Sequence, residues 1–151
     1  MADIVDSATR SRMMRAIRGK DTKPEVRLRK ALFAQGYRYR LHSENLPGSP
    51  DILLPRYRAA IFVHGCFWHG HDCHLFRLPT TRAEFWRQKI MGNRQRDILV
   101  QERLADEGWR VLTVWECSMK GRTRMPFDEL VSRVSDWLTG TGRQLEIAGT
   151  G

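Results

Sequence analysis

The sequence reads His64-Gly65-Cys66-Phe67-Trp68-His69-Gly70-His71-Asp72-Cys73-His74 near its centre. This stretch holds four of the five histidines and two of the three cysteines. It directly follows Ala59-Ala60-Ile61-Phe62-Val63, the most strand-like run in the chain. So many imidazoles and thiols in one loop, at the end of a buried strand, predict a chemical site rather than ordinary packing.

Thiolate sulfur and imidazole nitrogen are the ligands that zinc prefers, and a closed structural site needs four of them in a tetrahedron. Cys66, His71 and Cys73 are three candidates from one loop, and Cys117, at the end of a second strand-like run, is the only cysteine left. We therefore predict one structural zinc ion, with His74 as a weaker substitute ligand. The alternative is that the thiols are small apolar core residues.

Two large aromatic residues, Phe67 and Trp68, lie between the candidate ligands. A metal that held the loop would present them outward, and proteins that deform DNA insert such rings between base steps. The alternative is that both rings cover the metal site as local packing.

Composition points to a polyanionic partner. The 151 residues are enough for one domain with a real core, and 26 Lys and Arg against 17 Asp and Glu give a formal net charge of +9. No apolar run is long enough to span a bilayer, and the N-terminus lacks the apolar core of a signal peptide, so we expect a cytoplasmic protein.

The chain divides into three expected regions. Residues 1–21 form a basic arm or helix that contacts DNA, with Met14 as a second wedge; the alternative is a solvated helix or tail. Residues 22–139 form the folded domain. Residues 140–151 are Gly- and Thr-rich and are expected to be a flexible, frayed tail.

A helix is predicted from Thr22 to about Gln35, with Thr22 as N-cap and Glu25 as its capping-box partner. Glu25 also shares the buried stripe of this helix with two leucines. Its carboxylate is therefore either a cap alone or a group that binds a metal-bound water.

A half-buried strand is predicted over residues 37–41 and a short strand over 51–54, and a turn then leads into the strand 59–63. Asp51 would lie beside the end of that last strand, which is the geometry that a Mg²⁺-dependent nuclease needs. Where many such enzymes carry a carboxylate, a spacer and a lysine, this chain has Phe62, Val63 and His64. Only a backbone carbonyl, such as that of Val63, could replace the missing ligand.

A histidine is then the expected proton acceptor, with His69 as general base and His64 contacting a phosphate or the leaving group. Their roles could be exchanged, and either could be a spare zinc ligand or a surface imidazole. The longest helix, about 82–107, carries polar residues in its apolar stripe. Asp97 could orient His69 or pair with Arg94 or Arg96. Three further residues near the start of this helix are expected to face DNA, namely Trp86, Lys89 and Asn93.

A strand over residues 109–115 and a helix over 127–138 complete the α/β pattern. Four motifs cover nearly the whole length: Thr-Arg-Ser-x-x-Met-Arg-Ala-Ile at 9–17, Leu-Pro-Gly-x-Pro-Asp at 46–51, Phe-x-His-Gly-Cys-Phe-Trp-His at 62–69, and Gly-Trp-Arg-Val-Leu-x-Val-Trp-Glu-Cys at 108–117. In these motifs the chain resembles the very short patch repair (Vsr) DNA mismatch endonucleases.

The resemblance implies a restriction-endonuclease-like α/β/α core, with a central mixed sheet flanked by helices. It also implies one or two Mg²⁺ ions at Asp51, a general base at His69, and a structural zinc ion at Cys66, His71, Cys73 and Cys117. The chain departs from the family at Val63, where the family has threonine. This change is harmless if only the main-chain carbonyl binds metal, but any role of the threonine hydroxyl would be lost.

The implied reaction is a nick 5′ of the thymine in a T:G mismatch left by deamination of 5-methylcytosine. Phe67, Trp68 and Trp86 would intercalate, and Met14 would enter from the far side. The partner is then mismatched double-stranded DNA, and we expect a monomer that works with accessory mismatch-repair proteins. The alternatives are a restriction or homing-type endonuclease on the same core, and a non-catalytic zinc-bearing DNA-binding module.

Overall fold

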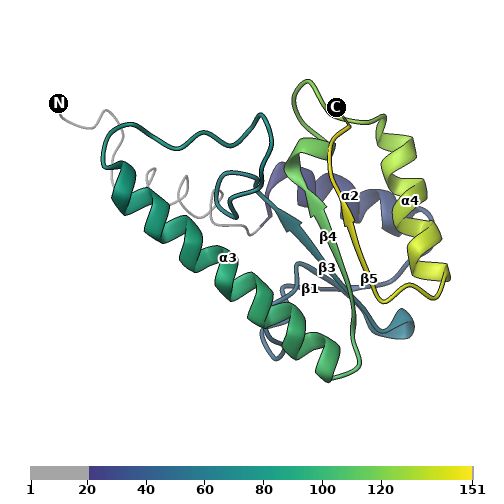
Figure 1. The fold of residues 1–151 in the computed structure, drawn as a ribbon. Coiled ribbons are helices and arrows are strands. Elements are labelled where there is room, and N and C mark those ends of the chain that lie inside the picture. The colour runs from purple at the N-terminus through teal and green to yellow at the C-terminus, as the bar shows by residue number, and fades with distance from the viewer. Residues whose placement is uncertain (1–20, 151) are drawn as a thin grey trace, which may run out of the picture.

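The computed structural model describes residues 21–150, which build a five-stranded sheet with helices on both faces (Figure 1). The strands are β1 (Arg40–Leu41), β2 (Ile52–Leu54), β3 (Ala59–His64), β4 (Arg110–Trp115) and β5 (Gln144–Ile147), and they lie in that order across the sheet. Antiparallel pairing joins β1, β2 and β3, and parallel pairing joins β3, β4 and β5. The sheet is therefore mixed, as predicted.

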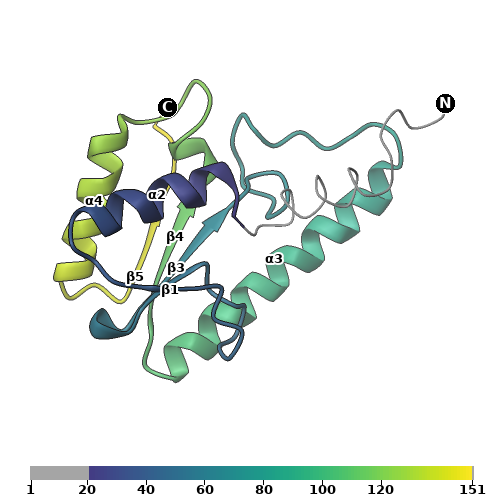
Figure 2. The ribbon, with the colours of Figure 1, turned by 180° about the vertical axis from the view of Figure 1, so that it is seen from behind.

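Three helices form the outer layers. α2 (Lys23–Ala34) and α4 (Phe127–Thr139) cover one face of the sheet, and α3 (Ala83–Asp106) crosses the other (Figure 2). Short 3-10 helices follow β2 at Pro55–Tyr57 and β4 at Glu116–Ser118. The predicted α/β/α arrangement is confirmed.

Period-two alternation along the strands assigns side chains to the two faces. Ile52, Ile61 and Leu112 pack in the larger core under α2 and α4. Phe62 and Val111 pack in the smaller core under α3. Because both faces of the central strands are buried, these strands read in the sequence as continuous apolar runs.

The start of α2 was predicted in part correctly. Thr22 is the N-cap, and its hydroxyl accepts a hydrogen bond from the backbone N–H of Glu25 at 3.4 Å. The capping-box role of the Glu25 carboxylate was wrong, because this group lies fully buried and accepts hydrogen bonds from Arg29 and His42 instead. The predicted strand over residues 37–41 is shorter, since it pairs with the three-residue β2 only at Arg40 and Leu41.

The frayed C-terminal tail was wrong as well. Residues 144–147 form β5, which pairs in parallel with β4 from Val111↔Gln144 to Val114↔Ile147. Leu145 and Ile147 alternate with polar neighbours and turn toward the core, where Ile147 is 2% exposed. A strand this short is hidden in sequence by the Gly- and Thr-rich turn that precedes it.

The expected DNA-contacting arm, including Met14, lies outside the described residues except for Asp21. Within residues 21–150, no helix is both long enough and apolar enough to cross a membrane.

Candidate active site and metal centre

The Cys66, His71, Cys73 and Cys117 side chains meet at the carboxyl ends of the two central parallel strands. Cys66, His71 and Cys73 come from the loop after β3, and Cys117 comes from the 3-10 helix after β4. Their three sulfur atoms and one imidazole nitrogen all lie within 4.8 Å of one another. The structure thus brings together the four residues predicted as zinc ligands. His74 is outside this group, because its Nδ1 faces the Thr123 hydroxyl at 3.4 Å.

The chemistry of this donor set fits a metal ion with soft ligands. Backbone N–H groups of Cys117 and Gly149 point at the Cys66 and Cys117 sulfurs at 3.3 and 3.2 Å, as they do around metal-bound thiolates. Burial raises the pKa of both thiols, so their buried charge needs a compensating cation. Burial lowers the pKa of His71 and favours the neutral imidazole that a metal requires. The cluster could therefore bind zinc.

Asp51 lies just before β2 and faces the end of β3. Its Oδ2 accepts a hydrogen bond from the backbone N–H of Val63 at 2.8 Å. Burial, the main cause, raises the pKa of Asp51 to about 7, and the nearby Glu25 carboxylate acts in the same direction. In an extended strand the N–H and C=O of one residue point to the same side. The Val63 carbonyl therefore also faces Asp51, and these two oxygen ligands suit Mg²⁺.

His64 and His69 form a stacked pair beside this carboxylate, with ring centroids 3.7 Å apart and planes 3° from parallel. His69 Nδ1 lies 2.6 Å from Asp97 Oδ2 on α3. The structure pairs Asp97 with His69 and not with Arg94 or Arg96, the alternative partners. A carboxylate at Nδ1 selects the tautomer that carries the proton on that nitrogen, which leaves His69 Nε2 as an acceptor.

His64 is 8% exposed, and within the described residues its Nδ1 has no hydrogen-bond partner. Burial, together with the neighbouring His69, lowers the pKa of His64 well below its usual value. The inner ring of the stack is therefore neutral, while His69 is the ring with access to solvent.

Glu25 is held by two residues that the sequence did not single out. Its Oε2 accepts hydrogen bonds from Arg29 at 2.7 Å and from His42 at 2.9 Å, while its Oε1 is buried without a partner among residues 21–150. The backbone N–H of His42 also donates to the carbonyl of Asp51 at 3.1 Å. His42 thereby fixes the distance between Asp51 and Glu25. Its left-handed backbone conformation, with φ of 47°, carries no signal in the sequence.

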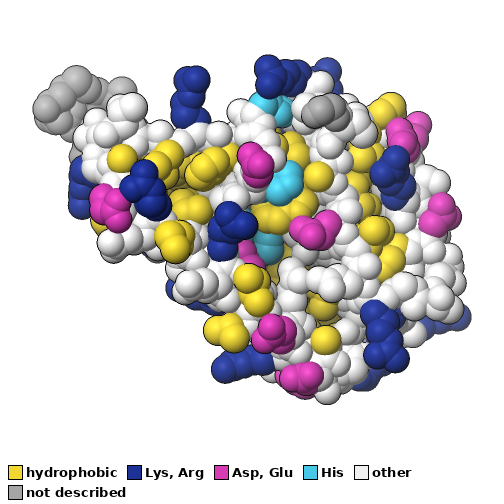
Figure 3. Space-filling view, in the orientation of Figure 1, with side chains coloured by type: hydrophobic (Ala, Val, Ile, Leu, Met, Phe, Trp, Pro, Cys, Tyr) yellow, Lys and Arg dark blue, Asp and Glu magenta, His cyan; other side chains and the backbone are white. Residues whose placement is uncertain are grey.

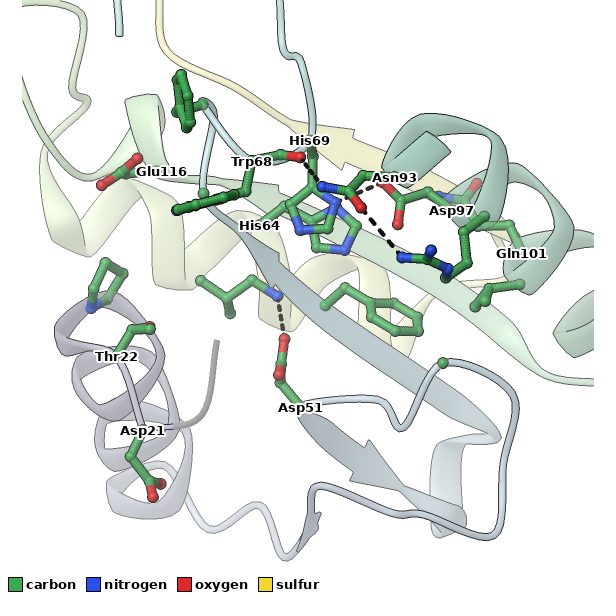
Figure 4. Close-up of a pocket in the computed structure, with 18 of the residues that line it drawn as sticks. Asp21, Thr22, Asp51, His64, Trp68, His69, Asn93, Asp97, Gln101 and Glu116 are labelled. Atoms are coloured by element: carbon green, nitrogen blue, oxygen red, sulfur yellow. Dashed lines mark hydrogen bonds and ion pairs between the residues drawn. The ribbon is translucent and has the colours of Figure 1, made fainter. Parts of the chain in front are cut away.

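Asp51, His64, His69 and Asp97 line a cleft of about 810 Å³ between the start of α2 and the middle of α3, whereas the buried Glu25 is not among the lining residues. Figure 4 shows Asp51 below the stacked His64 and His69 rings, with Asn93 and Asp97 reaching in from α3 and Thr22 on the opposite wall. Asp51 and His69 therefore share one cavity.

Two of the predicted wedge residues, Phe67 and Trp68, line this cleft, and the third, Trp86, packs against both. Phe67, Trp68 and Trp86 lie within 5.8 Å of one another between ring centroids, and all three are half-buried. They do not cover the metal cluster, whose apolar contacts come from Trp115, Leu75 and Ala148. Apolar side chains gather over the N-terminal end of α3 and its neighbouring loop, with Lys and Arg around them (Figure 3).

The two remaining predicted DNA-contact residues, Lys89 and Asn93, both line the cleft. Lys89 is exposed. The Asn93 amide donates to the Trp68 carbonyl at 2.8 Å, and its oxygen accepts from Arg96 at 3.2 Å. Asn93 is thus the partner that ties the aromatic loop to α3.

Comparison with known proteins shows the family of the chain. Residues 2–75 match the family model described as DNA mismatch endonuclease Vsr. The chain is 48% identical over 147 residues to the DNA mismatch endonuclease Vsr of Escherichia coli strain K12, covering 97% of this chain and 94% of that protein.

Two further relatives are named as nicking enzymes. Type II nicking enzyme V.XorIIP of Xanthomonas oryzae pv. oryzae is 47% identical over 119 residues, 79% of this chain and 88% of that protein. Type II nicking enzyme V.NmeAIP of Neisseria meningitidis serogroup A is 42% identical over 138 residues, 90% and 99% of the two chains. With this identity and coverage, the chain belongs to the Vsr family of DNA mismatch endonucleases.

Proposed function

We propose that this protein is a Mg²⁺-dependent, strand-specific endonuclease that nicks DNA 5′ of the thymine in a T:G mismatch. The observation that carries the proposal is the 2.6 Å contact between His69 Nδ1 and Asp97, in the same cleft as Asp51. An oriented imidazole beside a buried carboxylate is the arrangement that metal-assisted hydrolysis of a phosphodiester needs. The relatives named as nicking enzymes favour a single-strand cut over a double-strand cut.

Asp51 and the Val63 carbonyl would hold the Mg²⁺ ion. When bound, Mg²⁺ supplies Lewis-acid polarisation of the scissile phosphate and stabilises charge on the leaving oxygen. The cost of burying Asp51 as an anion is evidence that a cation belongs beside it, since a buried carboxylate that lacks a counter-charge is poorly solvated.

His69 Nε2 takes the proton from the attacking water, while Asp97 keeps the proton on Nδ1 and stabilises the imidazolium that forms. His64, buried and neutral, packs behind His69 and contacts the phosphate. Glu25, whose Oε1 is buried and has no partner among the described residues, would position water at the proposed Mg²⁺ site.

Selectivity for the mismatch follows from the aromatic cluster. Phe67, Trp68 and Trp86 form a rigid group beside the cleft, with Lys89 and Asn93 next to it. A T:G wobble costs less to unstack than a paired step, so insertion of these rings favours mismatched DNA before any base edge is read. We assign the far-side wedge to Met14.

The Cys66, His71, Cys73 and Cys117 cluster would hold one structural zinc ion, because four closed donors leave no open position for substrate. We infer a monomer, since all the proposed catalytic groups come from one chain. We infer a cytoplasmic location, where its DNA substrate lies. Accessory mismatch-repair proteins are proposed as further partners.

The test is a nicking assay on a panel of matched and mismatched duplexes, with Mg²⁺ present or chelated. We expect one nick, in the thymine strand of the T:G duplex, that requires Mg²⁺ and is absent from Asp51→Ala. Double-strand cleavage of matched DNA would instead indicate a restriction-type enzyme. DNA binding with no Mg²⁺-dependent nick would indicate a binding module.

A further inference from the structure

One tryptophan lies between the metal-type cluster and the imidazole pair. Trp115 is the last residue of β4 and is 9% exposed. His71 stacks on its indole ring, with centroids 4.2 Å apart and planes 13° from parallel. His64 meets the indole edge-to-face at 5.3 Å and 69°, and His69 does so at 6.3 Å and 71°. A single ring therefore packs against a predicted zinc ligand and against both imidazoles.

The orientation of this indole is fixed from the edge of the sheet. Trp115 Nε1 donates a hydrogen bond to Glu146 Oε1 on β5 at 2.8 Å. Hydrogen bonds to a carboxylate are shorter and stronger than those between neutral groups. With His71 against its face and Glu146 at its nitrogen, the ring has little freedom to rotate.

We propose that Trp115 and Glu146 are positioning residues, which hold His64 and His69 in the geometry needed for nicking. The proposal rests on the proposed function, because it concerns the aim of His69 Nε2 at the attacking water. Asp97 fixes one end of the His69 ring, but a hydrogen bond at one atom leaves the ring free to tilt about that point. The stack on His64, and the indole that flanks both imidazoles, restrict this tilt.

The aim of a general base matters because small displacements of a reacting atom cost large factors in rate. Residues that hold a catalytic group in place without touching the substrate act on the chemical step and not on substrate binding. The proposal therefore predicts a fall in the nicking rate at saturating enzyme, with no change in DNA affinity.

The experiment compares three variants of the full-length, zinc-loaded protein. Glu146→Leu removes the acceptor. Glu146→Gln keeps an acceptor oxygen at the same place. Gln144→Leu is the matched control: it makes a similar polar-to-apolar change on the same strand and face, but Gln144 bonds to Gln101 and not to Trp115.

We expect Glu146→Leu to lower the single-turnover nicking rate on T:G DNA by roughly tenfold. The DNA dissociation constant and the zinc content should equal those of the wild type, and the Glu146→Gln and Gln144→Leu rates should lie within about twofold of it. A Glu146→Leu rate equal to the wild-type rate would overturn the proposal. So would an equal fall in Gln144→Leu, which would indicate a general effect of the edge strand.

A further variant, at Trp115 itself, tests the same hydrogen bond from its donor side. Trp115→Phe keeps an aromatic ring but lacks the Nε1–H donor, so it should show a similar fall. Combined with Glu146→Leu it should add little, because the two changes remove one hydrogen bond. Additive effects would contradict the coupling.

Imidazole ¹⁵N NMR separates this proposal from the proposed function. If the wild type does not nick DNA, the proposed function fails, but the ring resonances of His64 and His69 still report the coupling. They should move in Glu146→Leu and stay in place in Gln144→Leu. Unmoved resonances in both variants would overturn the proposed positioning role.

Discussion

Asp51 is a residue of the site whose burial lowers the stability of the fold at neutral pH. Its carboxylate accepts one backbone hydrogen bond and has Glu25 nearby, which explains why its pKa rises to about 7. Because the pKa in the fold is above the unfolded value of 3.8, this group contributes stability below about pH 4. That contribution is lost as the pH rises through about 7.

We therefore predict that Asp51→Asn stabilises the protein at neutral pH when Mg²⁺ is absent. The gain in free energy of unfolding should grow from near zero at about pH 4 to about 2–4 kcal/mol above pH 7. Urea denaturation across this pH range, in Mg²⁺-free buffer without chelator so that zinc stays in place, measures it. The exposed control Asp106→Asn should show no such pH-dependent gain; an equal gain there would contradict the argument.

Asp97 is predicted to act through His69 alone. Asp97→Asn should lower the single-turnover nicking rate by roughly a hundredfold, because the amide no longer selects the Nδ1–H tautomer or stabilises the imidazolium. DNA affinity should be unchanged. Glu102→Gln, an exposed change on the same helix and outside the cleft, is the control for helix integrity, and a comparable loss of rate in that variant would contradict the special role of Asp97.

Single site residues could be predicted from the sequence where a polar side chain interrupts or adjoins an apolar pattern. Asp97 could be found because it is a carboxylate in an apolar helical stripe, and such a group needs a partner. Asp51 could be found because it precedes a buried strand. His42 could not be found, since its link between Asp51 and Glu25 depends on a left-handed turn and on a strand pair of two residues.

The loop after β3 and the short helix after β4 are the elements that the proposed zinc ion would join. Cys117→Ser should lose the single zinc equivalent expected by elemental analysis, and the melting temperature should fall by several degrees or more, because structural zinc contributes directly to folding. His74→Gln is the matched control. It lies beside the cluster but outside the donor set, so it should keep its zinc; loss of zinc there would mean that the ligand set is different.

Elements were predictable in proportion to their length and regularity. The long helix α3 and the strands β3 and β4 follow directly from apolar periodicity. β5 was missed because its four residues contain only two repeats of the period-two pattern. Its pairing with β4 is decided by the parallel register and not by local sequence. The same error concealed Glu146 as the partner of Trp115.

For the molecule as a whole, the net charge of +9 should govern how DNA affinity responds to salt. Apparent affinity should fall about a hundredfold or more between about 50 and 200 mM salt, since each phosphate contact releases counterions. Fluorescence anisotropy with a T:G duplex measures this slope. Lys89→Gln, in the cleft, should reduce the slope by about one contact, whereas Arg133→Gln, on α4, should leave it unchanged. A DNA affinity that does not change with salt concentration would contradict binding through phosphate contacts.

The layered architecture could be predicted from the order of the strand and helix patterns. The placement of the cleft could not, because it depends on α2 and α3 approaching the end of β3 from opposite faces. That approach is set by packing between residues far apart in the chain.

The Cys3His cluster has one more consequence, which concerns chain topology. Cys66 and Cys117 flank the entire crossover from β3 to β4, including α3. A metal ion held by both would close that crossover into a ring, much as a disulfide does, and would restrict the unfolded chain accordingly. A protease cut within residues 76–82 would then open the ring without releasing either fragment. The two halves would remain tethered until the ion was withdrawn.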